Sequence, residues 1–315
     1  MTSRLSATCK GLAANWVVAL FALLAGCIDS APQKQAAELV WGQRGITAGR
    51  LQKPRAIAID SDDQLYLVDM TARIQVFDAD GNYLRGWKTP VSKNGRPSGL
   101  TIDRDGRLLV ADTHYYQMLV YTTEGELLES ETIGGTLGQG PGEFGFVTDA
   151  VEDSQGNIYI GEYGDFDRIQ KFSPDGEYLL QWGGHGAEPG QFRRPQNMVV
   201  DHQDHIWVTD ACNHRIQVFD NAGKLLQIWG EEGSEVGKLY YPYDLALDGQ
   251  GHVYICEYGN HRVQKFTLLG ESVASWGSHG KEPGQLHNPW ALALDSKGRL
   301  HVVDSNNHRV QRVVF

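Results

Sequence analysis

The chain has 315 residues, 41% of them hydrophobic, and a formal net charge of −11 at pH 7. A chain this acidic repels the phosphate backbone of nucleic acids, and it contains no run of Lys or Arg, so we expect no nucleic-acid partner. Its length is large for one hydrophobic core, which favours a fold made of units that pack side by side.

The first 27 residues have the organisation of an export signal. Arg4 and Lys10 precede a largely apolar stretch, 12–24, which is short for a membrane span. It ends in Leu-Ala-Gly-Cys, 24–27, which resembles the lipobox of bacterial lipoproteins. The resemblance implies cleavage before Cys27 and a lipid on its thiol. An ordinary signal peptide with an incidental cysteine is the alternative.

Residues 28–37 form the predicted tether between Cys27 and the folded domain, 38–315. Asp29 is the third residue after the cleavage point, not the second. By resemblance to known lipoprotein sorting, this implies the outer membrane, facing the periplasm, over retention in the inner membrane. We therefore expect a monomeric, extracytoplasmic domain that contacts the membrane through its lipid anchor.

The remaining chain repeats a unit of four short apolar runs separated by turns rich in Asp, Asn and Gly. The clearest copy runs from Pro195 to Gly230. Its third run recurs at intervals of 44 to 51 residues, beginning at Arg73, Gln117, Arg168, Arg215, Arg262 and Arg309. One such four-stranded sheet cannot bury its own faces and needs neighbours. The repeat therefore predicts an all-β, six-bladed β-propeller.

The two ends of the domain predict how the ring closes. The sixth copy stops at Phe315 after its third strand, and residues 38–42 have the pattern of the missing fourth strand. The same pattern ends the third and fifth copies, at 178–183 and 272–277. We expect the N-terminal strand to complete the last blade and to remove an exposed edge.

We call the strands of each blade a to d, from the central channel to the rim. The predicted starts of strand a are Pro54, Pro97, Val147, Pro195, Pro242 and Pro289. The connections from strand d to the next strand a are long, for example 183–194, and they share one face of the ring with the b–c loops. Binding sites are commonly built from long loops on a rigid scaffold, so this long-loop face is the predicted functional face.

Three recurring motifs resemble NHL repeats: P-x-x-Φ-A-Φ-D, D-x-x-N-H-R-I-Q-V-F and G-x-x-P-G-Q-F. The resemblance implies a six-bladed propeller and no single activity, because such propellers include protein-binding, RNA-binding, sensor and enzyme members. The RNA-binding members use a basic face, which this acidic chain lacks. The enzymes include peptidyl-hydroxyglycine amidating lyases, whose zinc is held by histidines near strand a. Here no strand a begins with His, which disfavours a zinc lyase.

Several polar positions recur from blade to blade and are interpreted as structural. Strand b always ends in an acid, and an Arg follows in every blade but the second; the acids are Asp69, Asp112, Glu162, Asp210, Glu257 and Asp304. We interpret these pairs as straps of the b–c loop, the alternative being a ring of carboxylates that faces a ligand. His214, His261 and His308 are expected to close the b–c loops, while His185 and His279 are expected to be solvated. The Trp residues at the ends of strand d indicate packing between blades, and Cys212 and Cys256 are expected to be separate thiols.

The site prediction depends on positions at which the blades differ from one another. Asp149, Asn197 and Asp244 occupy one equivalent position in three consecutive blades, where the other three blades have Ala or Gly. Their oxygen atoms would suit a divalent cation such as Ca²⁺, and six-bladed lactonases of the regucalcin type hold a metal at a similar depth. Glu162 and Glu257 are further ligand or metal candidates. The predicted contacts at the channel mouth are Arg55, Gln196, Tyr243 and Trp290.

The sequence favours a binding module over an enzyme. It contains no recognisable Ser/His/Asp or Cys/His set, and residues from different blades meet only in three dimensions. The leading hypothesis is a lipid-anchored propeller that binds a protein, peptide or glycan through its long-loop face. The alternative is a metal-dependent hydrolase or lyase, lactonase-like or amidating-lyase-like, with its site at the channel mouth.

Overall fold

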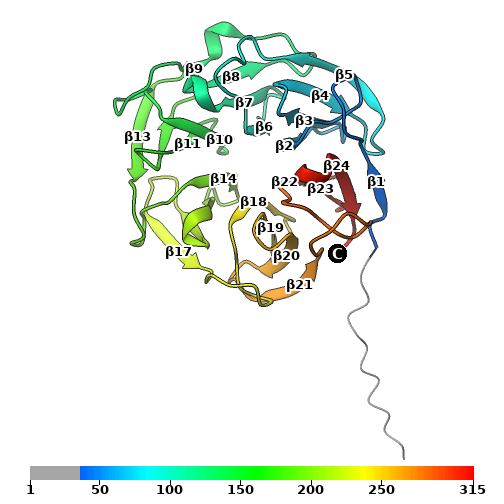
Figure 1. Cartoon of the computed structure of the whole chain (residues 1–315). Coiled ribbons are helices and arrows are strands. Elements are labelled where there is room, and N and C mark those ends of the chain that lie inside the picture. The colour runs from blue at the N-terminus through cyan, green and yellow to red at the C-terminus, as the bar shows by residue number, and fades with distance from the viewer. Residues whose placement is uncertain (1–35) are drawn as a thin grey trace, which may run out of the picture. The chain divides into compact units, whose positions relative to one another are not determined.

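Each repeated apolar run forms a short strand, and four consecutive runs pair as one antiparallel sheet. The computed structural model describes residues 36–315, in which six such sheets surround a central channel (Figure 1). The predicted six-bladed, all-β propeller is thereby confirmed. The predicted signal segment with Cys27, and the tether up to residue 35, lie outside the described residues.

Strands β2 to β24 build the blades in chain order. The first three blades are β2 (Pro54–Ile59), β3 (Leu65–Asp69), β4 (Arg73–Phe77) and β5 (Tyr83–Lys88); β6 (Gly99–Ile102), β7 (Leu108–Asp112), β8 (Gln117–Tyr121) and β9 (Ile133–Gly134); and β10 (Phe146–Glu152), β11 (Ile158–Tyr163), β12 (Arg168–Phe172) and β13 (Tyr178–Gly183). The next two are β14 (Pro195–Val200), β15 (Ile206–Asp210), β16 (Arg215–Phe219) and β17 (Leu225–Trp229); and β18 (Pro242–Leu247), β19 (His252–Glu257), β20 (Arg262–Thr267) and β21 (Ser272–Trp276).

The sixth blade is built from both ends of the described chain. It contains β22 (Ala291–Leu294), β23 (Leu300–Asp304), β24 (Arg309–Val313) and, as its outer strand, β1 (Leu39–Trp41). Strand β1 pairs antiparallel with β24, with Leu39 opposite Arg312 and Trp41 opposite Val310. The predicted closure by the N-terminal strand is confirmed.

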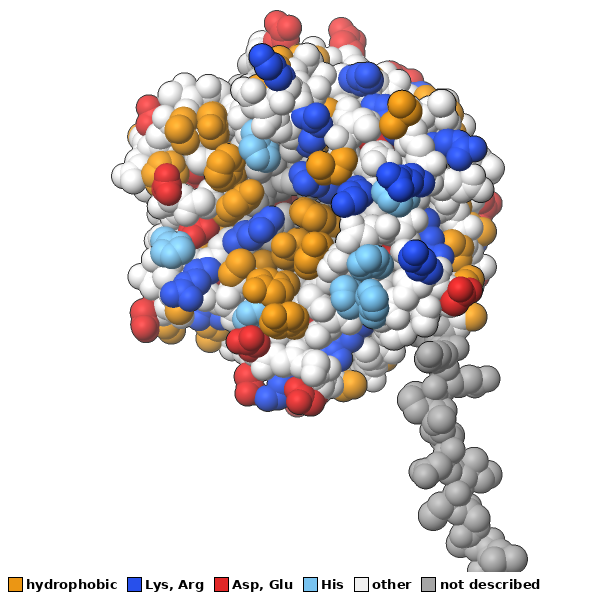
Figure 2. Space-filling model, in the orientation of Figure 1, with side chains coloured by type: hydrophobic (Ala, Val, Ile, Leu, Met, Phe, Trp, Pro, Cys, Tyr) orange, Lys and Arg blue, Asp and Glu red, His pale blue; other side chains and the backbone are white. Residues whose placement is uncertain are grey.

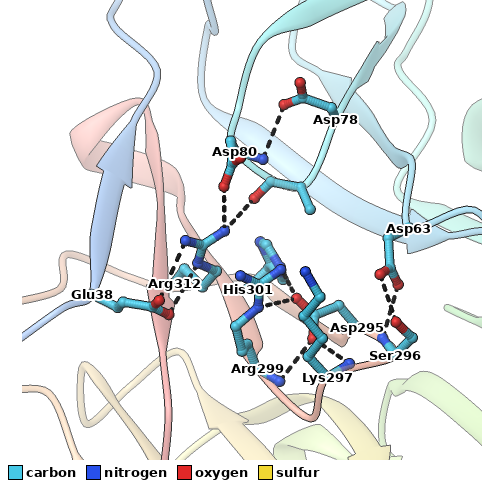
Figure 3. A network of polar contacts seen from close by, with 11 residues as sticks. Glu38, Asp63, Asp78, Asp80, Asp295, Ser296, Lys297, Arg299, His301 and Arg312 are labelled. Carbon is cyan, nitrogen blue, oxygen red and sulfur yellow. Dashed lines mark hydrogen bonds and ion pairs between the residues drawn. The ribbon is translucent and has the colours of Figure 1, made fainter.

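Polar contacts reinforce this closure (Figure 3). The Arg312 guanidinium on β24 pairs with the Glu38 carboxylate at 3.1 Å and with the Asp80 carboxylate of the first blade at 2.8 Å. On the same face, Asp63 of the first blade accepts hydrogen bonds from the backbone N–H and the hydroxyl of Ser296 in the sixth. Three segments distant in sequence are therefore joined at one seam.

Hydrophobic packing between blades forms the core. The Trp at the end of strand d lies against an aromatic ring of the next blade; for example, the Trp182 and Phe219 centroids are 5.8 Å apart. Gly223, in the c–d turn, also lies over the Trp182 ring, where an added Cβ would be 2.8 Å from it, and it has φ 78°. This turn therefore needs glycine both for space and for backbone conformation. The predicted role of these Trp residues is confirmed.

Two local features qualify this regular architecture. Blade two has an outer strand of only two residues, β9, preceded by the 3-10 turn η2 (Glu129–Glu131). Short 3-10 turns also form the b–c loops η1 (Thr113–Tyr115), η3 (Ala211–Asn213) and η4 (Ser305–Asn307).

Cys212 and Cys256 are free thiols, as expected. Among residues 36–315, we find no helix long and apolar enough to cross a membrane.

Candidate functional site

The repeated acid at the end of strand b forms a buried ion pair with the Arg that begins strand c. The N–O distances are 2.5 to 2.7 Å in five blades. The Arg also donates to carbonyl groups of the preceding long connection, as Arg215 does to Ala187, Glu188 and Gln191. Each pair therefore straps a long loop to its blade, which confirms the structural interpretation.

Glu162 and Glu257 belong to these straps and do not face the channel. Both side chains are fully buried and pair with Arg168 and Arg262 at 2.5 and 2.6 Å. They also accept hydrogen bonds from Gln170 and Gln264 of strand c. These two ligand candidates therefore have a structural position, because their oxygen atoms accept hydrogen bonds from Arg and Gln side chains of strand c.

The strap in blade two has no Arg. Gln117 replaces it and donates to Asp112 at 3.2 Å. Burial raises the pKa of Asp112 to about 6, and the hydrogen bond from Gln117 offsets only part of this effect. One oxygen of Asp112 is buried without a hydrogen-bond partner.

The histidines of the N-H-R signature join neighbouring blades. The Nδ1 atoms of His214, His261 and His308 accept the backbone N–H of Tyr241, Asn288 and Lys53 at 2.9 to 3.0 Å. His185 is largely exposed and pairs with Asp167. His279 lies against His261 and His287, with ring centroids 4.6 and 5.0 Å apart. In the described part of the chain, no three His, Cys, Asp or Glu side chains have the arrangement of a metal centre.

Strand a lines the channel in layers, one residue of each blade to a layer. The mouth layer on the long-loop face is Arg55, Ser98, Thr148, Gln196, Tyr243 and Trp290. The next layer inward is Ala56, Gly99, Asp149, Asn197, Asp244 and Ala291. In four blades a β-bulge between these positions shifts the register of strand a, which changes the direction of the backbone amides. The mouth layer nearly closes the channel, because the space it shares with the second layer is about 10 Å³, scarcely one water molecule.

The three predicted oxygen donors therefore lie one layer below the mouth, where they connect blades. Asp149 Oδ2 accepts the Met198 N–H at 3.0 Å and the Asn197 side-chain amide at 3.1 Å. Asp244 Oδ2 accepts the Leu292 N–H at 2.9 Å. Asp149 thus bonds to blade four and Asp244 to blade six, while Asp244 Oδ1 also accepts the Leu245 N–H of its own blade. Asn197 Oδ1 is buried and has no hydrogen-bond partner.

This set does not fit a divalent cation. A Ca²⁺ site needs carboxylate oxygens free to converge on the ion, and here both oxygens of each aspartate accept hydrogen bonds. Burial raises the pKa of Asp149 to about 7 and that of Asp244 well above its usual range, with the charge of Asp149 adding to the shift at Asp244. The second layer therefore contains two buried carboxyl groups that have no cationic partner among residues 36–315.

The mouth layer, in contrast, is cationic and aromatic. The Arg55 guanidinium lies over the Trp290 ring at 5.0 Å, and the Tyr243 ring lies 5.1 Å from Trp290. Gln196 accepts a hydrogen bond from Arg194, whose guanidinium covers Tyr243 at 5.3 Å. The four predicted mouth residues thus come together. Hydrophobic side chains gather at the centre of the face displayed in Figure 2, and Lys and Arg side chains surround them.

Five further residues at the mouth were missed by the sequence analysis. Arg194 also lies over Tyr163 at 4.8 Å, Tyr258 stacks on Tyr243 at 4.5 Å, and His114 contacts the rest of the mouth through Phe146. Tyr163 and Tyr258 follow the two Glu residues that depart from the Asp-led form of strand b. The change from Asp to Glu at the end of strand b was the signal in the sequence. The residue that reaches the mouth is the Tyr that follows, and not the Glu itself.

Comparisons with known proteins agree with the fold. The family model described as NHL repeat matches residues 192–219, 239–266 and 286–313, so the chain carries NHL repeats. Peptidylglycine alpha-amidating monooxygenase of Rattus norvegicus is 37% identical over 130 residues, which cover 38% of this chain and 13% of that protein. NHL repeat-containing protein 3 of Mus musculus is 28% identical over 176 residues, 50% of this chain and 49% of that protein. The chain thus matches less than two thirds of the length of either relative.

Among solved structures, a streptogramin B lyase superposes with a TM-score of 0.62 over 86% of this chain and 95% of that chain. Its sequence is 14% identical, so the likeness concerns the fold alone. The comparisons and the strand order together identify the described chain as a six-bladed β-propeller that contains NHL repeats.

Proposed function

We propose that the long-loop face of this propeller binds a protein, peptide or glycan, and that the channel mouth receives an anionic group of that ligand. The proposal rests on Arg55. Within residues 36–315 its guanidinium makes no hydrogen bond or ion pair and contacts the face of Trp290. In a chain with a net charge of −11, an unpaired, half-buried guanidinium is available to a carboxylate, sulfate or phosphate.

The surroundings of Arg55 strengthen the attraction for an anion. Burial lowers the pKa of Arg55, and the nearby charges of Arg194 and Arg96 lower it further. Three guanidinium groups therefore share the mouth, and the Arg194 guanidinium, like that of Arg55, has no carboxylate partner in the described structure. The tyrosine and tryptophan rings beneath them exclude water from one side, which strengthens a charged hydrogen bond. Because the mouth is shallow, it suits the end or edge of a larger ligand better than an enclosed small molecule.

Binding of matched probes tests the proposal. A peptide with a free C-terminal carboxylate, its amidated copy and a glucuronate oligosaccharide are titrated against the wild type and Arg55→Gln. We expect the charged probes to bind more tightly than the amidated peptide. Arg55→Gln should weaken them about 10- to 100-fold, the value of a hydrogen bond to a charged group. Arg104→Gln, an exposed cation on the opposite face, is the matched control and should change nothing; equal binding by Arg55→Gln and the wild type would refute the proposal.

We also propose that residues 1–27 direct export and that Cys27 carries a lipid, which would hold the propeller at the outer membrane. The proposal rests on the lipobox-like sequence before Cys27. Cys27→Ser should move the protein from the detergent phase to the soluble periplasmic fraction and should abolish incorporation of a radiolabelled acyl chain. A Cys27→Ser protein that still incorporates the label would end this proposal.

A lyase or hydrolase is the second candidate, favoured by His114 at the mouth. Its imidazole is kept neutral because burial lowers its pKa and the charges of Arg55 and Arg96 lower it further. Its Nδ1 is buried without a hydrogen-bond partner. A neutral imidazole beside guanidinium groups could take a proton from a bound substrate. Incubation with a peptidyl-hydroxyglycine, with and without added Zn²⁺ or Ca²⁺, should then give a product that His114→Gln fails to form.

A further inference from the structure

Below the mouth, the channel widens into a cavity that opens on the opposite face of the ring. We call this the short-turn face, because the short a–b turns lie on it. The volume of the cavity is about 420 Å³, within the range of small-molecule sites. Aliphatic side chains of strand a line its outer part in five of the six blades; they are Ile59, Ile102, Val200, Leu247 and Leu294. The tight layer of Arg55, Tyr243 and Trp290 separates this cavity from the long-loop face.

The inner end of the cavity is polar. Asn197 and Asp244 line it, and Thr101, another lining residue, donates to Asp149 Oδ1 at 3.2 Å. Asn197 Oδ1 is a buried acceptor without a donor, which costs free energy unless a ligand or water supplies one. Asp149 and Asp244 are 1% and 5% exposed, and neither has an ion pair with a cation of the described chain. Three acceptor groups at the closed end of an apolar cavity thus lack a positive partner.

The other charged groups at the cavity have protein partners. Asp103 pairs with Arg107 at 2.7 Å. Glu152 accepts the Arg104 backbone N–H at 2.6 Å, and the Arg104 guanidinium donates to the Asp153 carbonyl. Arg104 is the cation of the lining, at its exposed outer end. At the inner end, the carboxyl groups without a cationic partner are those of Asp149 and Asp244.

We propose that this cavity binds a small aliphatic amine in its ammonium form, which enters from the short-turn face. The alkyl chain would contact the ring of Ile, Leu and Val side chains. The ammonium group would donate to Asn197 Oδ1, which has no donor in the described chain, and to the remaining lone pair of an Asp244 oxygen. Asp149, which lies behind these lining residues, would act through its charge. A cation held there favours the ionised form of both carboxyl groups, whose pKa values burial has raised. This site is separate from the mouth and does not depend on the function proposed above.

Calorimetric titration of the purified full-length protein with n-hexylammonium at pH 8 tests the proposal. Hexan-1-ol supplies the same chain without charge, and hexanoate supplies it with the opposite charge. We expect n-hexylammonium to bind at least about tenfold more tightly than hexan-1-ol, and hexanoate to bind most weakly. Equal affinity for the amine and the alcohol would overturn the proposal, because the cavity would then recognise only apolar surface, and so would the absence of amine binding.

Two variants localise the binding. Asp244→Asn removes one charge and should weaken n-hexylammonium about 10- to 100-fold. Because it also removes an acceptor of a backbone amide and could disturb folding, Ala246→Phe is the second variant; it fills the cavity and leaves the hydrogen bonds of Asp244 in place. Ala246→Phe should abolish amine binding, while Arg55→Gln should leave it unchanged. Amine binding that survives Ala246→Phe in a folded protein would overturn the assignment to this cavity.

Discussion

The straps and the channel layers come from the same six blades and behave differently. The acid and the Arg of the strap recur in five blades with nearly the same geometry, and even the exception in blade two keeps the acid. The layer that contains Asp149 and Asp244 has polar residues in one half of the ring and Ala or Gly in the other. A contact that every blade needs is repeated, because the same loop must be fastened six times. A position that serves one ligand needs to differ around the ring, because the ligand has no sixfold symmetry.

The comparison assigns stability to the contacts that recur in the blades and binding to the positions that differ. Among changes that affect stability, removal of the closure strand should have the largest effect. Deletion of residues 38–42 removes β1 and exposes the edge of β24. It also breaks the contact between Glu38 and Arg312. We expect it to abolish most of the roughly 5–15 kcal/mol by which such domains are stable. Removal of residues 28–35 is the matched control; equal thermal midpoints for the two truncations would show that the closure is dispensable.

A strap should contribute to stability and not to binding. Arg215→Ala leaves the fully buried Asp210 without its cation and frees three loop carbonyl groups. We expect a loss of about 3 kcal/mol in the free energy of unfolding, measured by urea denaturation, and unchanged ligand affinity in the folded protein. Arg104→Ala, at an exposed site, should cost far less. A stable Arg215→Ala protein that no longer binds would place the straps among the functional residues.

The exceptional strap of blade two should make stability depend on pH. The pKa of Asp112 is about 6 in the folded protein, above the unfolded value of 3.8, so the unfolded chain ionises first. Stability should therefore fall as the pH rises from about 4 to about 6, by up to about 3 kcal/mol. Asp112→Asn should remove this part of the dependence when unfolding is followed at pH 4.5 and pH 7.5. The exposed Asp175→Asn should keep it, and an unchanged pH profile in Asp112→Asn would disprove the assignment.

The smallest effect is expected from divalent cations. Because the oxygens of Asp149 and Asp244 already accept hydrogen bonds, Ca²⁺ should not raise the thermal midpoint by selective binding to the folded state. Differential scanning calorimetry with millimolar Ca²⁺ or with a chelator should give the same midpoint. A rise of the thermal midpoint with Ca²⁺ that Asp244→Ala abolishes would instead support the predicted metal site. It would also show that residues of this layer can both connect blades and bind a cation.

The number of blades, the closure by the N-terminal strand and the straps could all be predicted from the sequence. Each depends on local pattern: alternating apolar residues define a strand, a fixed interval defines a blade, and an acid before a tight turn with Arg after it brings the two together. The roles of Trp182 and Arg215 could be read in this way because their partners follow at constant spacing. His214 was expected to close its own b–c loop and instead accepts the Tyr241 N–H of the next blade.

The contents of the channel could not be predicted from the sequence, because they depend on how the blades meet. Arg55 meets Trp290, and Asp244 meets the Leu292 amide, because six strands a converge on one axis after the ring has closed. The predicted mouth ligands Asp149 and Asp244, which follow a β-bulge in strand a, lie one layer deeper and bond to neighbouring blades. Spacing along the chain does not encode these encounters, because they are contacts between repeats and depend on the angle at which each blade packs on the next.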